Sequence, residues 1–141
     1  MADAQHMVFV YGTLMKGERN HDRFLCGEGA RFIAKAATRE HRFTMVVTPS
    51  LSTPGRETPS VFQQENGHRL QGQVFAVDGT RLAQLDALEK EYQRSLVDLD
   101  NGMQAWMYLK PQENIQVFAT VSAHLHLDRV NKSIEWREMR P

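Results

Sequence analysis

One carboxylate occupies a position from which it could act as an acid or a base. Leu82, Leu85 and Leu88 predict the apolar face of a helix that is capped by Asp78 or Thr80 and runs to about residue 90. At about 100° per residue, Glu89 falls inside that face, about 20° from Leu82. Burial raises the pKa of a carboxyl toward neutrality, where a general base works best. Glu89 is therefore a candidate general base, with a structural ion pair to an arginine such as Arg94 as the alternative.

A second stretch could bind an anion. Val8-Phe9-Val10 is apolar without alternation, which is typical of a buried strand, and Gly12 ends it because glycine turns at little steric cost. N–H groups that follow the end of a strand without ladder partners suit a carboxylate or phosphate. The backbone of Tyr11, Gly12, Thr13 and Leu14 is thus a candidate substrate-binding loop. An ordinary strand and turn is the alternative.

Two blocks of the chain, in order, carry a resemblance to a known family. The first is VFVYGTLMKG, residues 8–17, with Asn20-His21 and Leu25 behind it. The second is RLQGQVFAVD, residues 69–78, followed by LDALE at 85–89 and YQR at 92–94. Together they resemble the γ-glutamylcyclotransferase superfamily over residues 8–108, and they look most like its γ-glutamylamine cyclotransferase branch.

The resemblance implies an intramolecular aminolysis. The free α-amine of a γ-glutamyl group attacks its own side-chain carbonyl, closes 5-oxoproline and expels an amine. Glu89 matches the family's catalytic glutamate in Leu-Asp-x-x-Glu, the base that takes the proton and can return it to the departing nitrogen. The Tyr11–Leu14 loop would hold the α-carboxylate, as the corresponding loop does in the family. The substrate would be a γ-glutamylamine such as γ-glutamyl-ε-lysine, or a γ-glutamyl amino acid.

Other residues near Glu89 bear on the pocket and on the leaving amine. Tyr92 and Tyr108 are candidate pocket walls, with a place in the barrel core as the alternative, and Asp86 is expected to be structural. Lys90 stands where members of the resembling family commonly carry a glycine, and only two residues separate Glu89 from Tyr92. Both departures bear on the class of the leaving amine.

Two further functions stay open at this point. A non-catalytic module could bind small anions at the Tyr11–Leu14 loop, although a buried Glu89 would not help it. An amide hydrolase or acyltransferase on the same scaffold would use water or an external amine as nucleophile. The product distinguishes these reactions, because cyclisation yields 5-oxoproline and hydrolysis yields glutamate.

Composition limits the partners. Lys+Arg and Asp+Glu number 17 each, so a net charge of zero offers no basic field for nucleic acid or an anionic membrane. No apolar run approaches the roughly 18 residues of a membrane span. Residues 1–6 lack the features of a signal peptide and are expected to be a disordered tail. The single cysteine, Cys26, allows no intrachain disulfide, which favours a cytoplasmic location. The sequence does not indicate an oligomeric state.

No cofactor or metal is predicted. The chain lacks the glycine patterns of P-loop and dinucleotide sites. His124 and His126 share a face of an expected strand, but no motif nearby supplies the further ligands that zinc needs. Cys26 has no nucleophile motif around it and is expected to be a small apolar filler.

The sequence also predicts the helices and strands that must position these residues. A short helix is predicted from Asn20 to about Leu25, and single strands over residues 30–38, 43–47 and 117–127. Residues 61–64 and 70–77 are predicted to form a hairpin with Asn66-Gly67 at its tip, and residues 92–99 and 103–109 an antiparallel pair. Thr48–Ser60, rich in proline, serine and threonine, is predicted to be a surface loop that could close over the site.

The sum of these elements predicts a fold. Many strands with two short helices, without a repeating βα unit, favour an α+β fold: a small mixed β-barrel with short flanking helices. The resemblance implies the same γ-glutamylcyclotransferase-like fold. We expect a single domain over residues 1–141, with Ile134 and Trp136 packing the C-terminal tail on the barrel or on a partner subunit.

Overall fold

The computed structural model describes residues 5–12, 14–16, 18, 21, 25, 27, 29–49, 57–65, 67–90, 92–110, 125–128 and 130–136. Its elements, in chain order, are β1 (His6–Val10), β2 (Ala30–Ala37), β3 (Phe43–Pro49), β4 (Glu57–Gln63), β5 (Arg69–Val77), α2 (Gly79–Leu88), β6 (Gln93–Asp98), β7 (Gln104–Leu109), β8 (Leu125–Asp128) and β9 (Ser133–Trp136). The predicted α+β class is confirmed.

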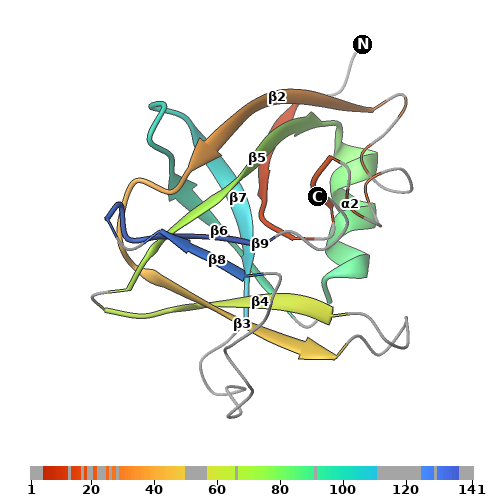
Figure 1. Ribbon diagram of the computed structural model, residues 1–141. Coiled ribbons are helices and arrows are strands. Elements are labelled where there is room, and N and C mark those ends of the chain that lie inside the picture. Colours follow the sequence, from red (N-terminus) through yellow and green to blue (C-terminus); the bar gives the residue numbers. More distant parts are fainter. Residues whose placement is uncertain are drawn as a thin grey trace.

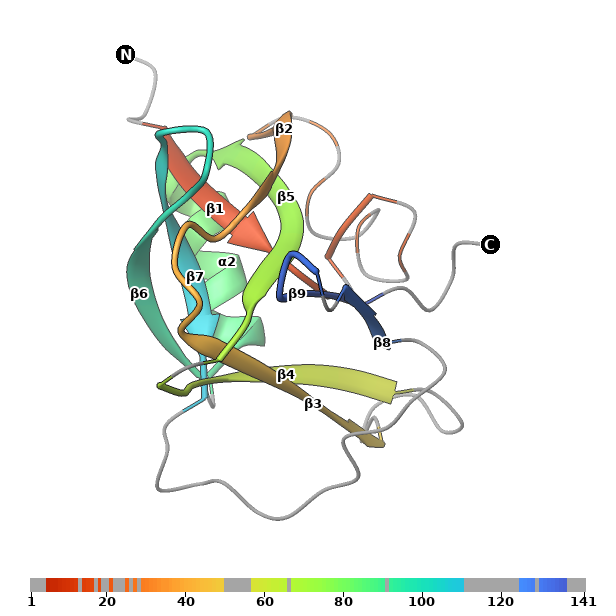
Figure 2. The same cartoon turned by 60° about the vertical axis from the view of Figure 1, so that its left-hand side comes forward.

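A mixed sheet of seven strands forms the body of the fold. Six strands follow the order β6-β7-β1-β5-β9-β8, and β2 also pairs with β5. β5 is the branch point, because β1 and β2 both run antiparallel to it over residues 73–77, whereas β9 runs parallel to its first two residues, Arg69 and Leu70. The sheet curls into a half-barrel, and α2 lies beside β1 and β5 (Figures 1 and 2). The predicted mixed barrel is confirmed in this form.

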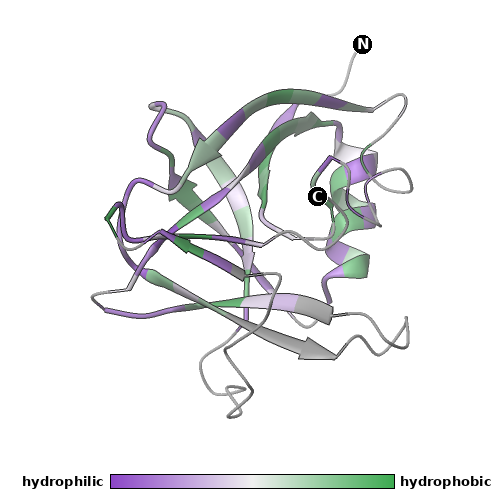
Figure 3. Cartoon of the chain, viewed as in Figure 1, coloured by the Kyte–Doolittle hydropathy of each residue, from purple (hydrophilic) through white to green (hydrophobic). Residues whose placement is uncertain are grey.

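The core lies inside this curl. Val8 and Phe9 are fully buried on β1, as their unalternating apolar pattern predicts. The hydrophilic residues of β5 lie in its first half, and its second half, residues 74–77, is hydrophobic throughout (Figure 3). Trp136 is fully buried on β9, which pairs with β5, so this segment packs on the barrel.

β1 and β7 run parallel, and this pairing positions the site. Val8 lies opposite Trp106 in the register. Because parallel strands end at the same edge of a sheet, the carboxyl ends of β1 and β7 meet. Tyr11, directly after β1, and Tyr108, near the end of β7, are thereby brought together from positions 97 residues apart, and the Tyr11 hydroxyl bonds to the Tyr108 backbone.

The hairpin predicted between residues 61–64 and 70–77 is wrong. β4 pairs with β3 in a separate two-stranded sheet, whereas β5 joins the large sheet. Gly67 lies at the crossing point, where a Cβ atom would be 2.6 Å from the Phe43 carbonyl oxygen. The chain therefore passes from one sheet to the other at this glycine instead of folding back on itself. Asn66 lies outside the described residues.

The surface loop predicted over Thr48–Ser60 is wrong at both ends. β3 continues to Pro49 and β4 already begins at Glu57. Pro59 is accommodated because each strand of a two-stranded sheet has an open edge, where a missing N–H costs no ladder bond. Residues 50–56 lie outside the described part of the chain.

Other predictions are confirmed or fall outside the described residues. The β6–β7 pair is antiparallel as predicted, and β8 covers the end of the predicted last strand. The predicted helix from Asn20 lies mainly outside, although the Leu25 N–H donates to the His21 carbonyl at 2.8 Å. Cys26, His124 and residues 1–4 also lie outside. Within the described ranges, no helix is long and apolar enough to cross a membrane.

Candidate active site

Glu89 closes helix α2. Asp78 caps the start of the helix, where its Oδ1 accepts a hydrogen bond from the Arg81 N–H at 2.8 Å. Glu89 is the C-cap residue with φ −100° and ψ 37°, and its N–H donates to the Leu85 carbonyl at 2.9 Å. The carboxylate thus projects from the last fixed position of a capped helix.

The inward face of α2 is narrower than the leucine pattern predicts. Leu82 and Leu85 are buried, but Leu88 is 39% exposed, so its predicted inward position is wrong. A spacing of three residues turns the helix face by about 60° each time, and by Leu88 the face has rotated away. Glu89 comes back to about 20° from Leu82, and the predicted core-facing position of Glu89 is confirmed by its place in a pocket wall.

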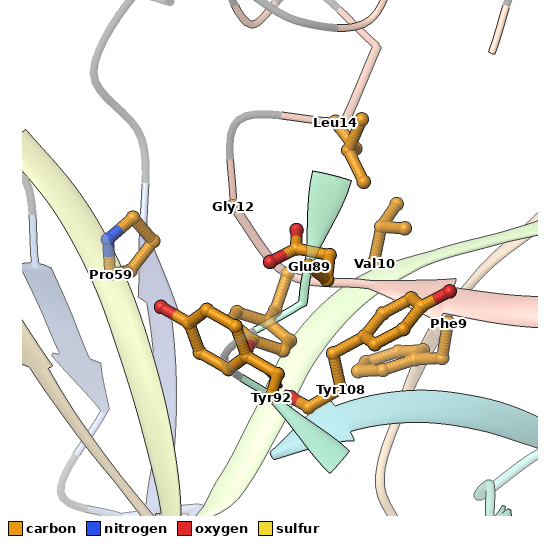
Figure 4. A pocket seen from close by; sticks show the side chains of 9 residues that line it. Phe9, Val10, Gly12, Leu14, Pro59, Glu89, Tyr92 and Tyr108 are labelled. Atoms are coloured by element: carbon orange, nitrogen blue, oxygen red, sulfur yellow. Dashed lines mark hydrogen bonds between the residues drawn. The ribbon is translucent and has the colours of Figure 1, made fainter. Parts of the chain in front are cut away.

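A pocket with about 400 Å³ of empty volume lies at the carboxyl ends of β1 and β7. Figure 4 shows the Glu89 carboxylate in its middle, close to Gly12 and between Pro59 and Val10. The structure brings six of the seven predicted site residues to this pocket, and the seventh, Thr13, lies outside the described residues. The lining residues are Phe9, Val10, Tyr11, Gly12, Leu14, Pro59, Glu89, Tyr92 and Tyr108.

The hydroxyls of the three pocket tyrosines are all hydrogen-bonded. Tyr11 donates to the Tyr108 carbonyl oxygen at 2.7 Å. Tyr108 donates to Asp86 Oδ1, also at 2.7 Å. The Tyr92 hydroxyl and Ser60 Oγ are 2.8 Å apart. These bonds hold the aromatic rings in place as pocket walls, and those of Tyr11 and Tyr108 use the hydroxyl hydrogen.

Glu89 differs from the three tyrosines in its hydrogen bonding and in its pKa. Burial raises the pKa of Glu89 from 4.5 to about 7, and no described residue donates a hydrogen bond to its carboxylate. Burial likewise raises the pKa of Tyr11 and of Tyr108, in the latter case with the bond to Asp86 as a further cause. The phenols stay neutral near pH 7, so Glu89 is the described pocket group that exchanges a proton in that range.

The arginine considered as a partner for Glu89 binds elsewhere. Arg94 Nη1 lies 2.9 Å from Asp86 Oδ2 and 3.1 Å from Asp86 Oδ1. Asp86, expected to be structural, therefore accepts from both Arg94 and Tyr108. The ion pair between Arg94 and Glu89 is not formed.

The loop after β1 lines the pocket at Gly12 and Leu14. The Met15 N–H donates to the Gly12 carbonyl at 3.0 Å, and the Lys16 N–H donates to Gln73 Oε1 at 2.7 Å, which holds the turn. Among the described residues, no protein group accepts from the N–H of Gly12 or of Leu14. Such donors are suited to an anionic group.

Gly12 is required for a reason other than the predicted one. The predicted turn is present, but Gly12 does not adopt the left-handed backbone conformation that favours glycine. A Cβ atom there would lie only 2.7 Å from Cγ of Pro59. Close approach of the two segments, rather than conformational freedom, excludes a side chain at this position.

A metal has no evident place in the described part of the chain. No group of three or more His, Cys, Asp or Glu side chains that could hold an ion occurs there. His126 is exposed on β8, and its expected neighbour His124 lies outside the described residues.

Phe9, Val10 and Pro59 line the pocket but were not predicted as site residues, and the contribution of residues 59 and 60 was missed altogether. Pro59 lines the pocket, and Ser60 holds Tyr92 in its wall. Both were assigned to the predicted surface loop because of the prolines around them. The run Ser60-Val61-Phe62, which continues directly from this segment, was the signal that a strand extends this far.

The fold and the pocket define a class of protein: a curled mixed sheet with a pocket that is lined by the loop after β1 and by a carboxyl to which no described residue donates a hydrogen bond. A profile of the family described as "Gamma-glutamyl cyclotransferase, AIG2-like" matches residues 8–137, and the chain belongs to this family.

Relatives of known name agree with this family. The chain is 35% identical over 111 residues to a candidate gamma-glutamylcyclotransferase of Drosophila melanogaster, covering 72% of this chain and 68% of the relative. It is 35% identical over 112 residues to a similarly named protein of Methanocaldococcus jannaschii, covering 74% and 84%. It is 33% identical over 105 residues to gamma-glutamylaminecyclotransferase C of Danio rerio, covering 67% of this chain and 62% of that relative.

Solved structures share the fold. An AIG2-like protein from Mus musculus superposes with a TM-score of 0.64 at 23% identity, over 96% of this chain and 99% of that one. The allophanate hydrolase of Kluyveromyces lactis superposes with a TM-score of 0.68 at 16% identity, over 84% of this chain. This chain spans only 19% of the hydrolase, so the likeness concerns the fold of one part of that protein.

Proposed function

We propose that this protein cyclises a γ-glutamyl group to 5-oxoproline and releases a free amine, with Glu89 as general base and acid. One observation carries the proposal. Among the described pocket groups, Glu89 combines a carboxylate without a hydrogen-bond donor and a pKa raised by burial to about 7. A base of that pKa is half ionised near neutral pH, where it can both accept and donate a proton.

The reaction balances without a co-reactant. The substrate α-amine loses a proton to the Glu89 carboxylate and its nitrogen attacks the γ-carbonyl carbon, which closes the five-membered ring. The bond from that carbon to the leaving nitrogen then breaks, and Glu89 returns the proton to this nitrogen. The products are 5-oxoproline and the amine, and Glu89 ends in its starting ionisation state.

The loop after β1 supports the orientation this reaction needs. The substrate must bend so that its amine lies over its own carbonyl, and holding such a geometry is worth several kcal/mol of barrier. We propose that the N–H groups of Gly12 and Leu14, together with the backbone of Tyr11 and Thr13, bind the α-carboxylate. The rings of Tyr92 and Tyr108 would then confine the side chain of the substrate.

The leaving amine is proposed to come from a γ-glutamylamine such as γ-glutamyl-ε-lysine, or from a γ-glutamyl amino acid. The relationship at 33% identity to a protein named gamma-glutamylaminecyclotransferase supports the first. The single cysteine supports our proposal that the enzyme works in the cytoplasm.

The test is a product assay. The purified protein is incubated with γ-glutamyl-ε-lysine and with γ-glutamyl dipeptides, and 5-oxoproline and glutamate are quantified. We expect 5-oxoproline in an amount equal to the released amine. Glutamate as the product would identify an amide hydrolase instead, and binding without any turnover would identify an anion-binding module.

A further inference from the structure

A second, more open cleft adjoins the pocket and shares part of its wall. It is lined by Asp86, Glu89, Lys90, Tyr92, Arg94, Trp106 and Tyr108, and it contains about 640 Å³ of empty volume. Glu89, Tyr92 and Tyr108 also line the first pocket. The carboxyl that would move the proton therefore lies where the first pocket and the more open cleft meet.

This junction divides a substrate into two parts. The bond to be broken must lie beside Glu89, because the proton passes from one side of that bond to the other. The proposed function has the N–H groups of Gly12 and Leu14 bind the glutamyl part in the first pocket. In that case the leaving amine extends into the open cleft. The side chains of the cleft then contact the leaving amine.

Arg94 is the most firmly held cation of the cleft. Its Nη1 pairs with Asp86 at 2.9 Å, and its guanidinium carbon lies 4.6 Å from the centre of the Trp106 ring. Its side chain is 28% exposed. Within the described residues, nothing accepts a hydrogen bond from Nε or Nη2. A fixed guanidinium with one free edge is suited to a planar carboxylate.

The charges around Arg94 favour the same ligand. Asp86 is compensated by Arg94 and by the Tyr108 hydroxyl. Lys90 adds a second cation to the cleft wall. When Glu89 is protonated, the described lining residues of the cleft carry two cations, Lys90 and Arg94, and one anion, Asp86. This positive balance disfavours a purely cationic leaving amine and favours one that carries a negative group.

We propose that Arg94 is a specificity-determining residue that binds a carboxylate on the leaving amine, so that the preferred substrates release an amino acid rather than a polyamine or an alkylamine. This inference rests on the proposed function. Asp86 holds Arg94 in place, and the Trp106 ring packs against the guanidinium.

The experiment uses two matched substrate pairs that differ in the carboxylate. γ-Glutamyl-ε-lysine is compared with γ-glutamylcadaverine, and γ-glutamylglycine with γ-glutamylglycinamide. In each pair the readout is the ratio of kcat/KM for 5-oxoproline formation. In at least one pair we expect the wild-type ratio to favour the carboxylate by about tenfold or more, the value of a charge-assisted hydrogen bond.

Variants locate the preference. Arg94→Gln should bring the ratio toward one, and Arg94→Lys, which keeps the charge but loses the fork, should give an intermediate ratio. Arg42→Gln is the matched control, because Arg42 pairs with Glu40 at 2.8 Å outside the cleft. It should leave the ratio unchanged. Thermal melts establish that each variant is folded, and Arg94→Lys serves if Arg94→Gln is not.

The outcomes separate the two claims. Wild-type ratios near one in both pairs, or a ratio that Arg94→Gln and Arg94→Lys do not change, overturn the inference while 5-oxoproline formation upholds the proposed function. No 5-oxoproline from any of the four substrates or from other γ-glutamyl dipeptides overturns the proposed function, and this inference with it.

Discussion

The last turn of α2 carries two carboxylates, three residues apart, in opposite surroundings. Asp86 faces the open cleft, where it accepts from Tyr108 and pairs with Arg94. Glu89 lines both the cleft and the first pocket, no described residue donates to it, and burial raises its pKa to about 7. Only about 60° of helix rotation separates them. The difference teaches that the partners around a carboxylate, and not its type, set whether it holds structure or exchanges protons.

The largest effect should come from neutralising one carboxylate at a time. Glu89→Gln removes the base and should lower kcat for 5-oxoproline formation by about 10²–10⁴. Asp86→Asn keeps an acceptor for the Tyr108 hydroxyl and should lower kcat by less than about tenfold. Steady-state assays of both variants, with thermal melts for folding, give the comparison. Equal losses in the two variants would mean that the carboxylates do not differ in role.

The second prediction concerns the dependence of stability on pH that Glu89 causes. The folded-state pKa of Glu89 lies above its unfolded value, so the folded state binds the proton more tightly and loses stability as pH rises from about 4.5 to about 7. Glu89→Gln resembles the protonated acid and should gain stability over wild type by about 3 kcal/mol at pH 8, but not at pH 4. Urea unfolding at the two pH values measures this. A variant that is less stable than wild type at pH 8 would show that the ionised carboxylate has a stabilising partner.

A third prediction concerns the pocket wall that faces Glu89. Gly12→Ala places a Cβ atom against Pro59, whose Cγ would be 2.7 Å away, and should displace the backbone donors and raise KM about tenfold. Pro59→Ala removes the obstructing atoms, so the double variant should recover most of the affinity. KM values for the four proteins form the cycle. Failure of Pro59→Ala to rescue would place the cause elsewhere than in this contact.

The smallest effect should follow from loosening Tyr92. Ser60→Ala and Tyr92→Phe each remove the hydrogen bond between Ser60 Oγ and the Tyr92 hydroxyl, and each should lower kcat/KM by about threefold. Because both remove one bond, the double variant should lose little more than either single variant. Strictly additive losses would show that the two groups act independently.

Local patterns predicted the local parts of this molecule. The strands predicted over residues 30–38, 92–99 and 103–109 match β2, β6 and β7, and the period of 3.6 residues placed Glu89 on the side of α2 that lines the pocket. The failures concern contacts between distant segments. The pairing of β3 with β4, and the parallel pairing of β1 with β7, depend on partners that no local window contains.

The candidate site shows the same division. The Tyr11–Leu14 loop and Glu89 lie in two sequence blocks that carry the family signature, so the sequence alone identified them. The contact of Gly12 with Pro59 and the bond of Asp86 to Tyr108 arise only after the chain has folded. These contacts explain why position 12 needs a glycine and why Asp86, unlike Glu89, accepts a hydrogen bond from Tyr108.

The most direct test of this account is a titration of Glu89 itself. The carboxyl carbon of Glu89 is followed by NMR as pH is varied, with Glu89→Gln to assign the signal, and the pH dependence of kcat/KM is measured beside it. The account predicts that this carbon titrates near pH 7 and that activity is lost on the acid side with the same midpoint. A carboxyl that titrates near its ordinary value of about 4.3, with activity retained well below pH 6, would contradict it.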